Sequence, residues 1–220
     1  MDSYPNVRSE RMRIYHFLNE EFGLKDLREK RLMISNIMEL NDPFEFFFLE
    51  TSDRNFRESI KAGKKSAAKQ FGVICFSANW KNPVQWSHYA NRHKGICLGF
   101  DVPIDCLEKV TYVNERVHHN GELNISDVME LMKTKYIDWK YEEEYRAFIE
   151  LKEDENGIYY SDFSDNLKLK RVVVGAESKL TRKDVDAALG DLSPDVEVFK
   201  ARPAFKKFEI TKNKNEKLWT

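Results

Sequence analysis

The sequence has little of what marks the more specialised classes of protein. It contains three cysteines at unrelated spacings, which excludes a disulfide framework and the paired spacing of a zinc site. Nine glycines and six prolines among 220 residues exclude a collagen-like or linker-rich chain. There is no run of about 18 apolar residues, and the N-terminal segment MDSYPNVRSERMR lacks the apolar stretch of a signal peptide. These absences predict a cytoplasmic protein with reduced cysteines and no membrane partner.

No excess of one charge is present either. The chain has 36 basic and 37 acidic side chains and a net charge of -1, so binding to nucleic acid would require a local basic patch. One basic cluster lies on a segment with a helical pattern and consists of Lys61, Lys64, Lys65 and Lys69. A solvated helix face is the simpler interpretation of this cluster. Steering of phosphate groups is the alternative.

The chain does have enough apolar residues for one substantial core. Hydrophobic residues make up 41% and charged residues 33%, which excludes a disordered chain, and no repeat or composition shift marks a second domain. We therefore expect a single domain over residues 1–220, with its core in about residues 10–210. Short strands punctuated by small helices, without a long β–α–β period, predict an α+β fold with mixed or antiparallel strands.

The spacing of apolar residues assigns each expected element to a segment. Helices are expected at residues 24–30, 55–70, 83–91, 125–136 and 181–189. Strands are expected at residues 13–17, 32–35, 73–77, 95–101, 110–113, 141–149, 169–174, 197–201 and 206–210. Thr181 with Asp184 is typical of a capped helix start. The triplet Asn41-Asp42-Pro43 predicts a turn, because Asn and Asp cap local amides and proline presets φ.

The most informative segment is the acidic one at residues 141–149. Side chains two apart share a strand face, so Glu142, Glu144 and Arg146 would point the same way. Two carboxylates and a guanidinium are costly to bury unless they are paired. An exposed edge strand would carry them at no cost, and this alternative stays open. The functional interpretation is that one carboxylate enters a cleft, hydrogen-bonds a sugar hydroxyl and stabilises a developing positive charge.

A second group of polar side chains lies on the helix expected at residues 83–91. Trp86, His88 and Tyr89 cannot all face one core, so at least one should meet a pocket or solvent. A histidine or tyrosine in such a place is more often a structural group than a catalytic one. The same caution applies to His16, which lies in the middle of an expected strand.

Several familiar catalytic signatures are missing. The chain has no glycine-rich phosphate loop, no Gly-x-Ser-x-Gly turn and no Cys-x-x-Cys pair. Cys75 and Cys97 lie in apolar strands, where thiols are usually inert. His118 and His119 lie beside a turn without a carboxylate or cysteine at ligand spacing, so we expect no bound metal there.

Five motifs along the chain together resemble those of a known family. They are Ile14-Tyr15-His16-Phe17, Asn41-Asp42-Pro43-Phe44-Glu45, Cys75-Phe76-Ser77, Trp86-Ser87-His88-Tyr89-Ala90 and Trp139-x-Tyr141-Glu142-x-Glu144-x-Arg146. This succession resembles a bacterial domain-of-unknown-function family marked by FNDPFE, W-S-H-Y-A and W-x-Y-E-x-E-x-R motifs. The resemblance covers roughly residues 10–210. The layout is in turn similar to ADP-ribosyltransferases, especially the DNA-modifying toxins of bacterial toxin–antitoxin pairs, and implies their split sheet.

The resemblance to these toxins implies NAD as substrate and a place for each candidate residue. Glu144 would hold the ribose 2′-hydroxyl and stabilise the oxocarbenium-like transition state, with Glu142 as the less favoured candidate. His16 would contact the NAD ribose, and Tyr89 would lie against the nicotinamide ring. Further residues implied in the cleft or at its rim are Ser77, Trp86, His88, Asn41, Asp42 and Glu45.

Three functions compete on these patterns. The first is an ADP-ribosyltransferase that uses NAD to modify a macromolecule, nucleic acid being favoured over protein. It would act as a toxin or antiphage defence effector, and an antitoxin or other regulatory partner is a candidate. The second is a non-catalytic module on the same fold that binds a nucleotide or a partner chain. The third is a nuclease that holds a divalent metal with Glu142, Glu144 and Asp42.

Overall fold

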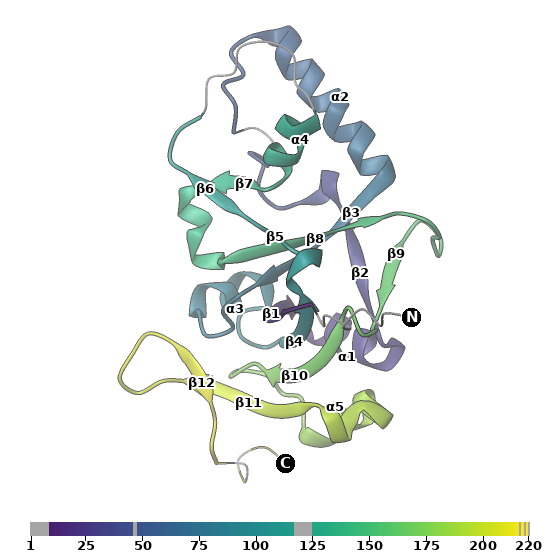
Figure 1. Ribbon diagram of the computed structural model, residues 1–220. Coiled ribbons are helices and arrows are strands. Elements are labelled where there is room, and N and C mark those ends of the chain that lie inside the picture. The colour runs from purple at the N-terminus through teal and green to yellow at the C-terminus, as the bar shows by residue number, and fades with distance from the viewer. Residues whose placement is uncertain (1–8, 46–47, 117–124, 216, 218, 220) are drawn as a thin grey trace, which may run out of the picture.

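A mixed β-sheet forms the framework of the computed structural model, which describes residues 9–45, 48–116, 125–215, 217 and 219 (Figure 1). Within these residues the main path of the sheet runs β12 (Ile210–Lys212), β11 (Glu197–Pro203), β10 (Lys168–Val174), β4 (Ile96–Pro103), β1 (Arg11–Leu18), β3 (Phe71–Ser77), β2 (Arg31–Asn36), β9 (Tyr159–Asp162). Off this path, β3 also pairs with β8 (Glu144–Glu150), which pairs with β5 (Glu108–Lys109). A separate parallel pair joins β6 (Thr111–Val113) and β7 (Thr134–Tyr136).

The helices lie on both sides of this framework. The α-helices are α1 (Glu20–Glu29), α2 (Arg54–Gln70), α3 (Pro83–Tyr89), α4 (Ile125–Met132) and α5 (Arg182–Leu189). Short 3-10 helices are η1 (Ile37–Glu39), η2 (Ile104–Cys106), η3 (Ile137–Glu142) and η4 (Gly190–Asp195). α1 and α5 contact each other at one end of the molecule, and α2 and α4 lie at the other (Figure 1). In the described part of the chain, no helix combines the length and apolar content of a membrane span.

The sheet is nearly interrupted between β1 and β3. β1 pairs with β4 along its full length, from Arg11 opposite Pro103 to Leu18 opposite Ile96. Its pairing with β3, by contrast, is confined to Tyr15 opposite Ser77. The sheet therefore consists of a first half (β1, β4, β10, β11, β12) and a second half (β2, β3, β5, β8, β9) that meet at one residue pair. An opening between two strands that diverge in this way can hold a pocket.

Alternation along the strands places the core on both faces of the first half. Ile14, Leu98 and Val172 face α1 and α5 and belong to the largest cluster of buried residues. Their sequence neighbours Tyr15, Cys97 and Val173 face the other way and pack with the indole of Trp86 on α3. A third cluster joins α2 and α4 to β3 of the second half. The α+β class expected from the sequence is confirmed.

Four expected elements are wrong in their bounds. The helix expected at residues 24–30 begins at Glu20, where the Asn19 side chain caps it. The helix expected at residues 125–136 ends at Met132, because residues 134–136 leave it to pair in parallel with β6. The strand expected at 141–149 begins only at Glu144, and Glu142 lies in η3. The strand expected at 206–210 is a loop, because the hairpin closes between Ala204 and Glu209 and β12 starts at Ile210. β9 was not expected from the sequence.

Candidate functional site

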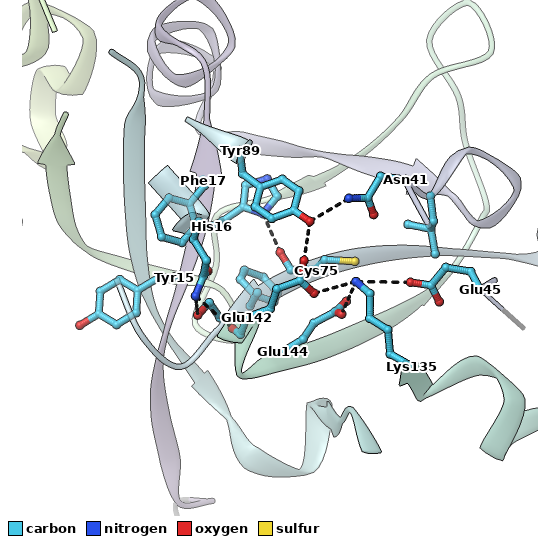
Figure 2. Close-up of a pocket in the computed structure, with 14 residues that line it drawn as sticks. Tyr15, His16, Phe17, Asn41, Glu45, Cys75, Tyr89, Lys135, Glu142 and Glu144 are labelled. Atoms are coloured by element: carbon cyan, nitrogen blue, oxygen red, sulfur yellow. Dashed lines mark hydrogen bonds and ion pairs between the residues drawn. The ribbon is translucent and has the colours of Figure 1, made fainter. Parts of the chain in front are cut away.

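A pocket lies at the divergence between β1 and β3 (Figure 2). It is lined by Tyr15, His16, Phe17, Leu40, Asn41, Glu45, Cys75, Phe76, Ser77, Gln85, Tyr89, Lys135, Glu142 and Glu144. Its volume is about 120 Å³. A cavity of about 150 Å³ holds one benzene molecule, so the pocket is of the size of a single six-membered ring.

Helix α3 brings Tyr89 to the pocket. The helix starts at a fixed point, because the Asn82 side chain accepts a hydrogen bond from the Val84 amide (2.9 Å) and Pro83 occupies the first turn. Side chains four apart share a helix face, so Gln85 and Tyr89 both reach the pocket.

The other two residues expected from this helix lie elsewhere. Trp86 is fully buried in the core, where its indole nitrogen donates to the Trp80 carbonyl oxygen at 2.6 Å. His88 faces outward, with Nδ1 2.9 Å from the hydroxyl of Tyr141. Neither side chain lines the pocket. The helical period explains this result. Successive residues of a helix are rotated by about 100°, so residues 86 and 88 point away from the face that residues 85 and 89 share.

The floor of the pocket is a buried cluster of ion pairs, here called the carboxylate–lysine cluster: Glu45, Lys135, Glu142, Glu144 and Arg146. The Lys135 ammonium lies 2.6 Å from Glu142 Oε2, 3.1 Å from Glu144 Oε2 and 3.5 Å from Glu45 Oε1 (Figure 2). Arg146 donates to both oxygens of Glu45, at 2.7 and 3.0 Å. The alternative that these side chains lie on an exposed edge strand is therefore wrong. These side chains are buried because each finds a partner of opposite charge.

The two glutamates differ in how strongly they are neutralised. Burial alone would raise the pKa of Glu144, but the charges of Arg146 and Lys135 outweigh it and hold that pKa at about 2. Burial raises the pKa of Glu142, and Lys135 opposes this rise only in part. Three carboxylates share two cations in this cluster, and of the two glutamates Glu142 is the one whose pKa these cations leave raised.

Glu142 completes its hydrogen bonding with the side chains of the pocket wall. Tyr89 donates its hydroxyl to Glu142 Oε1 and accepts a hydrogen bond from Asn41 Nδ2 at 2.7 Å (Figure 2). Burial, followed by the nearby charge of Glu142, raises the pKa of Tyr89. The phenol therefore stays protonated and acts as a donor. Tyr89, Asn41 and Glu142 form a hydrogen-bonded chain along one side of the pocket.

His16 and Ser77 approach the pocket from β1 and β3. The His16 Nδ1 lies 2.8 Å from the Cys75 carbonyl oxygen, and burial lowers the pKa of this imidazole. A neutral ring that donates from Nδ1 keeps Nε2 as an acceptor. The Ser77 hydroxyl donates to the Asn79 carbonyl and accepts from the Asn79 amide and Gln85 Nε2. It has no capacity left for a ligand.

Among the remaining candidates, Asp42 stabilises a turn and Glu45 pairs with Arg146. The Asp42 Oδ1 accepts from the Phe44 amide at 2.9 Å, which holds the expected turn, and Asp42 does not line the pocket. Glu45 is buried beneath the pocket rather than at its rim. Burial raises the pKa of the Cys75 and Cys97 thiols, in agreement with their expected inertness. His118 and His119 lie outside the described residues.

Sequence reasoning missed two residues of the site. Gln85 could have been found, because it precedes Tyr89 by one helical turn and so shares its face. Lys135 carried no comparable signal, since it was assigned to the end of a helix. In the part of the chain that is described, no group of three His, Cys, Asp or Glu side chains is arranged to hold a metal ion.

Comparison with protein families, with curated proteins and with solved structures finds no match to this chain.

Proposed function

We propose that this protein is an ADP-ribosyltransferase-like enzyme that uses NAD to modify a macromolecule, with nucleic acid favoured over protein as acceptor. The supporting observation is that side chains from separate motifs meet in one pocket: His16, Asn41, Ser77, Tyr89, Glu142 and Glu144. The resemblance in sequence implies a grouping of this kind around NAD. A bacterial toxin or antiphage effector is the biological role that fits this proposal.

In the proposed reaction, the nicotinamide ring enters the pocket, whose volume suits one six-membered ring and whose walls include Phe17 and Tyr89. The bond between ribose C1′ and the nicotinamide nitrogen breaks, and nicotinamide leaves as a neutral molecule with the bonding electron pair. A carboxylate beside the ribose stabilises the positive charge at C1′. An oxygen or nitrogen of the acceptor then bonds to C1′ and loses its proton.

The contacts favour Glu142 over Glu144 as the carboxylate that meets the sugar. Glu144 is held by Lys135 and Arg146, so a sugar hydroxyl would have to displace a buried cation from it. Glu142 has one cation and the Tyr89 hydroxyl as partners. A ribose hydroxyl can replace the phenol without leaving a buried charge unpaired. Glu144 then acts as a positioning residue that holds Lys135 against Glu142.

The test is calorimetric titration with NAD, together with nicotinamide release in the presence of cell lysate. We expect Glu142→Gln to abolish release while NAD binding and the melting temperature are retained. Glu143→Gln is the matched control, because Glu143 turns away to accept from Asn79 Nδ2 and does not line the pocket. Labelled NAD then identifies the acceptor among DNA, RNA and protein. Absence of binding at millimolar NAD, or release that survives in Glu142→Gln, would contradict the proposal.

One observation favours the second function, a non-catalytic binding module on the same fold. Both glutamates already have cation partners, as structural carboxylates do. This version predicts saturable binding of a nucleotide without nicotinamide release. The metal-dependent nuclease receives no such support, because the Lys135 ammonium lies between the carboxylates that would hold the metal and Asp42 does not line the pocket.

A further inference from the structure

The loop between β11 and β12 carries two aromatic rings that are fully open to water. The relative exposure of Phe205 is 90% and that of Phe208 is 102%, the two highest among the large hydrophobic residues of the described chain. Single exposed apolar residues are ordinary, but two phenylalanines three positions apart at one loop tip are not. Between them lie Lys206 and Lys207, both exposed. We call residues 205–208 the basic–aromatic loop.

The basic–aromatic loop is held in place by its own hairpin. The Ala204 amide donates to the Glu209 carbonyl oxygen at 2.9 Å, next to the pairing of Pro203 with Ile210. The hairpin base is fixed in turn, because the Ile210 amide donates to the Lys81 carbonyl oxygen at 2.7 Å. Figure 1 shows the loop projecting beyond the sheet. The fold therefore presents these rings to solvent at a defined place.

The surroundings of the loop are basic. Arg202 lies 4.2 Å from the centre of the Phe205 ring, and Lys206 and Lys207 make no ion pair or hydrogen bond to another described residue. Among described residues 200–215 the basic side chains are Lys200, Arg202, Lys206, Lys207, Lys212 and Lys214, against the single acidic Glu209. In a molecule of net charge -1, the hairpin thus carries a local excess of basic side chains, of which Lys212 is ion-paired with Glu197 and Lys200 donates to the Ser178 carbonyl oxygen.

We infer that the basic–aromatic loop binds single-stranded nucleic acid. Unpaired bases stack on exposed aromatic rings, and neighbouring ammonium groups neutralise the phosphates between them. The order ring, ammonium, ammonium, ring in Phe205–Phe208 matches this alternation of bases and phosphates. The lysines of α2 do not offer it, because no exposed ring is interleaved with them.

The position of the lysines argues against a membrane surface as the partner. The hairpin closes between Ala204 and Glu209, so Lys206 and Lys207 occupy the apex of the loop and the two rings flank it. A loop that inserts into a bilayer carries apolar side chains at its apex, because the burial of ammonium groups ahead of the rings is costly.

The loop lies against the N-terminal end of α3. A groove of about 480 Å³ separates it from α3 and is lined by Pro83, His93 and residues of the hairpin. Lys81, which anchors the hairpin, directly precedes the cap of α3, the helix that carries Tyr89. The inference about the loop does not require the pocket to be catalytic.

The test measures fluorescence anisotropy of a labelled single-stranded oligonucleotide of about 15 nucleotides, within the range that one small binding module covers. We expect binding that Phe205→Ala/Phe208→Ala weakens about a hundredfold, because two stacks are lost and each is worth about tenfold. Lys206→Gln/Lys207→Gln should lower the slope of log K against log salt by about 1.4, since two phosphate contacts are lost. Because all four side chains are exposed, these variants are expected to fold.

The control variant Lys65→Gln/Lys69→Gln removes the same charge from the exposed face of α2 and should change neither the affinity nor the slope. Absence of oligonucleotide binding at low salt, or unchanged binding by the phenylalanine variant, would overturn the inference. Binding to phosphatidylserine vesicles that the phenylalanine variant loses, without oligonucleotide binding, would assign the loop to membranes and overturn it as well. Nicotinamide release is read independently, so failure of the loop and failure of the proposed enzyme are distinguishable.

Discussion

At the scale of single residues, the carboxylate–lysine cluster is defined by how its five charged side chains pair with one another. Arg146 and Lys135 together satisfy Glu45 and Glu144, and they leave Glu142 with one cation and a phenol. This difference in partners is the reason that the proposed function assigns the sugar contact to Glu142.

Lys135→Met tests the role of the ammonium in this cluster. Removal of one partner of a buried ion pair costs about 3–5 kcal/mol, because the remaining charge stays buried without compensation. Urea unfolding should show a loss of this size. Lys133→Met is the control, since Lys133 makes surface ion pairs with Glu108 and Glu130 that are worth about 1 kcal/mol or less. Equal losses in the two variants would contradict the buried cluster.

Asp26 predicts a pH dependence of stability. Burial, reinforced by Glu29, raises the pKa of this carboxyl from 3.8 to about 7 in the folded protein. The folded state therefore keeps a proton that the unfolded chain loses first, and this group lowers stability progressively as the pH rises from about 4 to about 7. Asp26→Asn should increase the free energy of unfolding at pH 8 by about 2–4 kcal/mol, since one pKa unit corresponds to about 1.4 kcal/mol.

The measurement is urea unfolding of wild type and Asp26→Asn from pH 4 to pH 8. The two curves should converge at the acid end and separate toward pH 8. Glu21→Gln, on the exposed face of the same helix, serves as the control and should follow the wild type above pH 5. A difference between wild type and Asp26→Asn that does not grow with pH would contradict the raised pKa.

At the scale of elements, backbone contact decides how closely β4 can approach β1. A Cβ atom at Gly95 would lie 2.0 Å from the Leu18 carbonyl oxygen, a backbone atom that cannot turn aside. Gly63, in the middle of α2, would meet no atom within 4 Å. Tertiary packing therefore requires glycine at position 95, whereas nothing in the packing of the described residues requires it at position 63.

We expect Gly95→Ala to lower the free energy of unfolding by about 3 kcal/mol or more, the upper range for overpacked sites. Gly63→Ala should raise it by about 0.5–1 kcal/mol, because alanine has the higher helix propensity. Urea unfolding of both variants under the same conditions checks the pair. Similar effects of the two substitutions would show that β1 and β4 are not packed as closely as described.

At the scale of the whole molecule, the order of the chain ties the two halves of the sheet together. The chain builds β1 in the first half, β2 and β3 in the second, β4 in the first, β5, β8 and β9 in the second, and β10–β12 in the first. In the described chain the two halves are joined by the backbone pair Tyr15–Ser77, and neither half is built from one continuous segment of the sequence.

We therefore expect a single cooperative unfolding transition. Tryptophan fluorescence reports on Trp80, Trp86, Trp139 and Trp219, which are spread over the chain, and far-ultraviolet circular dichroism reports on the backbone. The two signals should coincide in urea, as they do for a two-state domain. Separate transitions would mean that the two halves of the sheet unfold independently, although the chain passes between them several times.

The sequence by itself determined the α+β class, most helices and strands, and the cap of α5. These features follow from local periodicity and local hydrogen bonds, such as the capping box of Thr181 and Asp184. The tertiary structure alone decided which cations pair with each glutamate, that Lys135 lies among the carboxylates and that residues 205–208 form an exposed loop. The reason is physical: Glu45 and Arg146 are 101 positions apart in the chain, and no local pattern records an ion pair across that distance.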